Sequence, residues 1–75
     1  MGAADTTRLG ILGCGNVFER YVAGLRQFEN IEIVWCADLD QALARREAGT
    51  AGIPAAGSPD EALAGALGDA DLVLN

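Results

Sequence analysis

Two glycines and one acid are spaced as a dinucleotide-binding site requires. Gly13 and Gly15 follow a short apolar run, and Asp38 ends a second apolar run further along the chain. A turn without side chains lets a pyrophosphate approach the backbone N–H groups at the start of a helix. An acid at the end of the next strand can accept hydrogen bonds from the adenosine ribose hydroxyls. The pattern therefore predicts that Gly13 and Gly15 bind phosphates and that Asp38 binds the ribose.

Each of these residues also has a purely structural interpretation. The two glycines could form only a tight strand–helix turn, and Asp38 could cap the helix that follows it. Asn16 opens the first helix, where it could act as a cap or contact the cofactor phosphates. Asn75 lies at the carboxyl end of the last apolar run, where ligands bind in open α/β sheets. The predicted cofactor-binding residues are Gly13, Gly15, Asn16, Val17, Asp38 and Asn75.

The same residues indicate which cofactor is bound. The carboxylate of Asp38 would repel a 2′-phosphate, which favours NAD while leaving NADP possible. The five basic residues are all Arg, and the chain has no Lys or His to serve as a conventional base. We therefore expect no catalytic residue in this chain. Cys14 and Cys36 lack the spacing of metal ligands, so no metal site is predicted and the two thiols are expected to be reduced.

Composition limits the possible partners. The chain has 75 residues, of which 51% are hydrophobic, a high share that suggests missing neighbours. A net charge of −6 argues against nucleic acid and against an anionic membrane as partners. No apolar run approaches the length of a membrane span. Residues 1–7 are small and polar and resemble no targeting signal, so we expect a disordered leader and a cytoplasmic protein.

The pattern of apolar residues predicts elements that alternate along residues 8–75. The expected strands are 8–12, 31–37, 53–56 and 71–75, and the expected helices are 16–28, 40–48 and 58–67. Ser58, Pro59 and Glu61 form a helix start with a capping box. Such alternation implies an α/β fold with a parallel sheet and right-handed crossovers, in the strand order 3-2-1-4. We read this as an incomplete Rossmann-type fold with about four strands and three helices.

Individual positions carry further expectations. Gly10 in the first strand is expected to allow close packing of a helix. Phe18 stands where the dinucleotide fingerprint has its third glycine, so its ring should push the first helix outward or turn toward a pocket. Apolar residues at helical spacing should form one buried helix face. That face comprises Phe18, Tyr21, Val22, Leu25 and Phe28.

The ordered set of motifs resembles the Gfo/Idh/MocA oxidoreductases. The run 8–16, the segment Cys36-Ala37-Asp38, the helix start at 58–63 and the strand at 69–75 all look like the matching parts of that family. The resemblance implies a nicotinamide-binding domain followed by an α/β substrate domain, in a parent protein that is a homo-oligomer. It also implies a catalytic lysine in an E-K-P motif and often a histidine, both beyond Asn75.

The resemblance thus implies hydride transfer between nicotinamide and a small sugar- or cyclitol-like substrate. Two alternatives remain open from the sequence. One is a nucleotide-sensing regulatory module that lacks the downstream lysine. The other is a segment of a methyltransferase that binds S-adenosylmethionine, which also uses a glycine-rich loop and an acid after its second strand.

Overall fold

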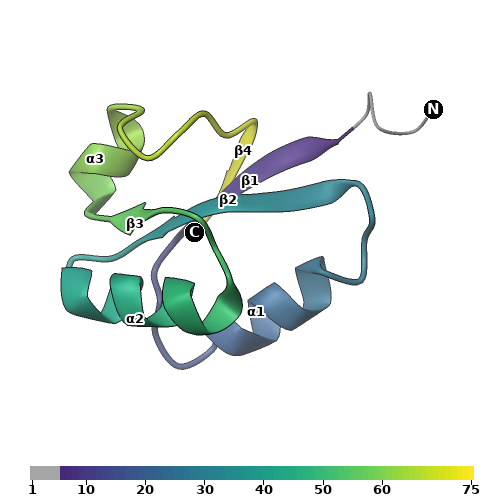
Figure 1. Ribbon diagram of the computed structural model, residues 1–75, viewed down its shortest axis with the longest axis horizontal. Helices are drawn as coiled ribbons and strands as arrows, with labels where there is room; N and C mark the ends of the chain where they lie inside the picture. The colour runs from purple at the N-terminus through teal and green to yellow at the C-terminus, as the bar shows by residue number, and fades with distance from the viewer. Residues whose placement is uncertain (1–5) are drawn as a thin grey trace.

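The computed structural model describes residues 6–75, which form a four-stranded parallel sheet with the strand order β3-β2-β1-β4 (Figure 1). Strands and helices alternate along the chain, as expected. The strands are β1 (Thr7–Leu12), β2 (Ile31–Ala37), β3 (Ala56–Gly57) and β4 (Leu72–Leu74). The helices are α1 (Phe18–Leu25), α2 (Gln41–Ala51) and α3 (Pro59–Leu63). The predicted α/β fold and strand order are confirmed.

The helices form two layers. Helices α1 and α2 lie on one face of the sheet, and α3 lies on the other face (Figure 1). The larger core cluster joins Phe18 of α1 and Ala48 of α2 to the apolar residues of β1 and β2. The smaller cluster joins Ala62 of α3 to Trp35 of β2. Phe18 is only 1% exposed. Its ring therefore belongs to the core under α1.

The two central strands show a register shift that explains Gly10. The pairing of β1 with β2 shifts between Leu9 and Gly10, which places Gly10 beside Trp35. A Cβ built on Gly10 would lie 2.2 Å from Cζ2 of Trp35. The expectation that this glycine admits a helix was wrong, because the space above it is filled by an indole from the neighbouring strand.

A polar contact fixes the start of β4 beside β1. The backbone N–H of Arg8 donates to Oδ2 of Asp71 at 2.9 Å, and the N–H of Asp71 donates to the carbonyl of Arg8 at 2.7 Å. An ion pair between their side chains spans 3.7 Å. Asp71 therefore precedes the strand and serves a structural role. Strand β4 is shorter than the expected 71–75.

Several boundaries differ from the sequence prediction near the N-terminus. Strand β1 begins at Thr7, which the sequence prediction had placed in the leader of residues 1–7. Residues 1–5 of that expected leader lie outside the residues that the structure describes. Helix α1 covers Phe18–Leu25 instead of 16–28. Two members of the expected apolar face are largely exposed: Tyr21, within α1, by 47%, and Phe28, beyond the end of α1, by 58%. The interpretation of Tyr21 as a packing residue was therefore wrong.

The later elements show how local capping sets their ends. Asp40 caps α2, and this helix continues past its expected end at residue 48 to Ala51. Gly52 is its C-cap, and the φ of 73° at Gly52 is the left-handed conformation that stops a helix. The capping box of Ser58 and Glu61 is present in full. Helix α3 nevertheless ends at Leu63 instead of 67, and β3 covers 56–57 instead of 53–56. Within residues 6–75, no helix is long and apolar enough to cross a membrane.

Candidate cofactor site at the carboxyl edge of the sheet

The glycine turn connects β1 to α1 and is anchored on β2. The N–H of Gly13 donates to the carbonyl of Ala37 at 2.7 Å. Gly13 has a φ of 100°, which a residue with a side chain rarely adopts. Gly15 does not have a positive φ, and a Cβ built on it would meet no atom within 4 Å. Gly13 is thus required by the backbone, whereas Gly15 leaves open space that a ligand can enter.

The start of α1 has no side-chain cap. Val17 occupies the N-cap position without a capping hydrogen bond, and Asn16 lies one residue earlier in the turn. The structural interpretation of Asn16 as a cap was therefore wrong. Both residues are exposed, Val17 by 48%. Uncapped N–H groups at a helix start retain hydrogen-bonding capacity for water or an anion.

The carboxylate of Asp38 contacts two loops at once. Its Oδ2 accepts a hydrogen bond from the N–H of Cys14 at 2.8 Å, and its Oδ1 accepts one from the N–H of Asp40 at 2.9 Å. These two bonds, that from Cys14 first, lower the pKa of Asp38. The bond to Cys14 joins residues 24 positions apart. Nothing in the local sequence indicated this bond.

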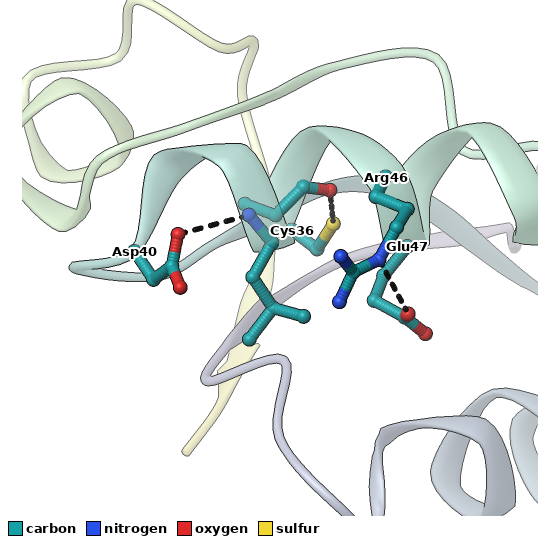
Figure 2. Close-up of polar contacts among 6 residues, drawn as sticks. Cys36, Asp40, Arg46 and Glu47 are labelled. Atoms are coloured by element: carbon teal, nitrogen blue, oxygen red, sulfur yellow. Dashed lines mark hydrogen bonds and ion pairs between the residues drawn. The ribbon is translucent and has the colours of Figure 1, made fainter.

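Asp40, and not Asp38, caps α2. Oδ1 of Asp40 accepts a hydrogen bond from the N–H of Leu43 at 3.1 Å (Figure 2). The alternative in which Asp38 caps this helix is therefore wrong. The thiol of Cys36 donates to the carbonyl of Ala44 at 3.5 Å, a bond marked by the dashed line at Cys36 in Figure 2. Asp38 is left as the link between the glycine turn and the loop before α2.

A cavity of about 280 Å³ brings three predicted residues together. Gly13, Asp38 and Asn75 line it, and they directly follow β1, β2 and β4. The cavity is completed by Leu12, Leu39 and Pro59. Leu39 is 89% exposed, and sequence reasoning missed it. The sequence did contain a signal for Leu39, because it is a large apolar residue immediately after the acid that ends a strand.

The remaining predicted residues lie elsewhere around the turn. Gly15 and Asn16 line a second cavity of about 350 Å³, between α1 and α2. Its other lining residues are Cys14, Glu19, Leu43, Arg46 and Glu47. The guanidinium of Arg46 lies 3.8 Å from the carboxylate of Glu47 (Figure 2). Of the predicted residues, Gly13, Asp38 and Asn75 thus line the first cavity and Gly15 and Asn16 the second, whereas Val17 lines neither of the two.

The two thiols of the chain are poorly suited to act as nucleophiles or metal ligands. Cys14 and Cys36 are free and buried. Burial, followed by the proximity of Cys36, raises the pKa of Cys14 to about 12. A neutral thiol is a weak nucleophile and a weak metal ligand. Among residues 6–75, no group of three or more metal-ligating side chains is found.

Comparisons with known proteins give one informative match. No protein-family profile matches the chain. No curated protein matches it either. A solved structure described as a "putative myo-inositol dehydrogenase from Sinorhizobium meliloti 1021" is 28% identical with a TM-score of 0.70. The match covers 93% of this chain and 21% of that protein.

The match agrees with the resemblance that the motifs indicated, because inositol dehydrogenase is a member of the Gfo/Idh/MocA group. The chain spans about a fifth of the length of this neighbour, 21%. Over nearly its whole length, the chain is similar to a Rossmann-type segment of a dehydrogenase of the Gfo/Idh/MocA type.

Proposed function

We propose that this chain is the NAD(P)-binding segment of an oxidoreductase that transfers hydride between nicotinamide and a hydroxyl or carbonyl carbon. The observation that carries the proposal is the cavity at the carboxyl edge of the sheet. Gly13, Asp38 and Asn75 line it from the ends of three neighbouring parallel strands. Ligands of open α/β sheets bind outside the carboxyl ends of the strands.

The residues of this edge fit a dinucleotide. The open space at Gly15 and the uncapped start of α1 suit a pyrophosphate. Asp38 uses each carboxylate oxygen for one backbone N–H and keeps further lone pairs for the ribose hydroxyls. Its negative charge opposes a 2′-phosphate, which supports NAD over NADP. When bound, the nicotinamide ring supplies the hydride chemistry, and this segment holds the adenosine and phosphate part.

The substrate is proposed by similarity alone. The solved neighbour carries the name of a myo-inositol dehydrogenase, which supports a cyclitol- or sugar-like small molecule for the parent protein. We propose further that the parent is a homo-oligomer whose catalytic lysine lies beyond Asn75. On this proposal the 75-residue chain alone binds NAD weakly and shows no dehydrogenase turnover.

The proposal is tested by Gly15→Val in the full-length protein that carries this chain. A branched side chain at Gly15 would occupy the open space without clashing with the protein. We expect the affinity for NAD, followed by calorimetric titration, to fall at least about tenfold, a loss of about 1.4 kcal/mol.

Gly49→Val is the matched control. Gly49 lies in α2, and a Cβ there also meets no atom within 4 Å. This control should retain wild-type affinity. Unchanged titration of a folded Gly15→Val protein would contradict the phosphate-binding role of the turn.

A further inference from the structure

The carboxylate of Asp38 occupies a position between the two loops that a dinucleotide must contact. One oxygen holds the N–H of Cys14, the residue between the two glycines of the turn. The other oxygen holds the N–H of Asp40, the cap of α2. The glycine turn itself is a short connection with a left-handed residue and no side-chain cap on its helix. Its position therefore depends on a few backbone hydrogen bonds.

Among the residues that the structure describes, three hydrogen bonds join this turn to β2 and to the residue that follows it. The N–H of Gly13 and, at 3.7 Å, the thiol of Cys14 both donate to the carbonyl of Ala37, and the N–H of Cys14 donates to Asp38. The bond from the thiol is long and has a weak sulfur donor. The bond to Asp38 has a charged acceptor, and such bonds are roughly twice as strong as neutral ones. Asp38 is therefore the side chain that holds the backbone N–H of Cys14 at the end of β2.

We propose that Asp38 is a positioning residue for the phosphate-binding turn, in addition to being a ribose acceptor. The inference rests on the proposed dinucleotide site. It goes further because it assigns part of the effect of Asp38 on cofactor affinity to the hydrogen bond between Asp38 and Cys14, which involves no cofactor atom. Loss of the carboxylate then weakens the binding of the pyrophosphate through Cys14, whether or not the ligand has ribose hydroxyls.

An amide cannot replace the carboxylate in this position. Asn offers one acceptor oxygen and one NH₂ donor, whereas both backbone partners of Asp38 are N–H donors. In an Asp38→Asn protein, one of these two N–H groups would face another donor. Asp69→Asn is the matched control, because it removes the same charge from an exposed loop residue.

The experiment compares NAD with its analogue that lacks the 2′- and 3′-hydroxyls of the adenosine ribose. Affinities are measured by calorimetry for the wild-type full-length protein, Asp38→Asn and Asp69→Asn. We expect Asp38→Asn to lose at least about tenfold for NAD and at least about threefold for the dideoxy analogue. Asp69→Asn should change neither affinity. If the loss disappears with the dideoxy analogue, Asp38 acts through the ribose alone and the inference is overturned.

A second measurement needs neither ligand nor variant. In the unliganded wild-type protein, the amide resonance of Cys14 should titrate with the same midpoint as the carboxyl carbon of Asp38, below the ordinary range of an aspartate. Independent titration of the two nuclei would overturn the inference and leave the cofactor site intact. A wild-type protein that binds neither NAD nor NADP would instead overturn the proposed function.

Discussion

The contact between Gly10 and Trp35 predicts a large effect from the smallest possible substitution. In Gly10→Ala, the new methyl group would lie 2.2, 2.3 and 2.5 Å from three atoms of the Trp35 ring, where ordinary contacts begin at 3.4 Å. Trp35 is 2% exposed and is the largest fully buried side chain. The indole cannot swing into solvent, so either the ring or the β1–β2 pairing must shift.

Overpacking of this kind typically costs about 1–3 kcal/mol, and three clashing ring atoms place the expected loss at about 2–3 kcal/mol. A chain of this length has a total stability of only about 4–11 kcal/mol. The loss should lower the melting temperature by about 10–20 °C. Urea unfolding followed by the fluorescence of the single tryptophan measures the same change in free energy.

Gly24→Ala provides the control, because Gly24 lies in α1 and a Cβ there meets no atom within 4 Å. This variant should be as stable as the wild type or slightly more stable. In a Trp35→Leu background, Gly10→Ala should cost at least about 1 kcal/mol less, as followed by circular dichroism. Equal stability of Gly10→Ala and wild type, or additive effects in the double variant, would refute the packing argument.

Four further predictions follow from contacts described above. In the full-length protein NAD should bind more tightly than NADP, and Asp38→Arg should narrow or reverse this difference in competition titrations; tighter NADP binding by the wild type would contradict the assignment. Ser58→Ala should cost about 1 kcal/mol in thermal unfolding, because Oγ of Ser58 accepts the N–H of Glu61 at 3.1 Å, and Ser58→Thr should restore most of it. Burial raises the pKa of Cys14 in the folded protein to about 12, above the ordinary thiol value of 9.0, so stability should decrease as the pH rises from about 9 to 12, and Cys14→Ala should flatten this dependence. The chain alone should self-associate in sedimentation through β4, where Leu72 is 59% exposed at the edge of the sheet, and Leu72→Lys should yield monomer.

The parts of the fold that depend on neighbouring residues were predictable from the sequence. Ser58, Pro59 and Glu61 act within one helical turn, and the structure contains the capping box they predicted. The alternation of apolar runs likewise led to the correct strand order. Helix ends were less accurate, because Gly49 and Gly52 are both plausible stops and the left-handed φ of Gly52 is visible only in the structure.

Contacts between distant residues could not be predicted. The packing of Trp35 on Gly10 depends on a register shift between two strands. The bond from Cys14 to Asp38 depends on how closely the turn approaches the end of β2. The candidate site was therefore identified by residue type, while the contacts that position it came from the structure. Its affinity for a dinucleotide stays a prediction.

The reciprocal hydrogen bonds of Arg8 and Asp71 also have a consequence for synthesis on the ribosome. Strand β1 is synthesised first and can pair with β2 soon afterwards. Its other edge pairs with β4, which begins next to Asp71, 63 residues after Arg8, and stays unpaired until that segment has been synthesised. During that interval one row of β1 backbone groups is unpaired and can bind other nascent chains. We expect chaperone demand to be highest just before Asp71 leaves the exit tunnel, and to fall once it pairs with Arg8.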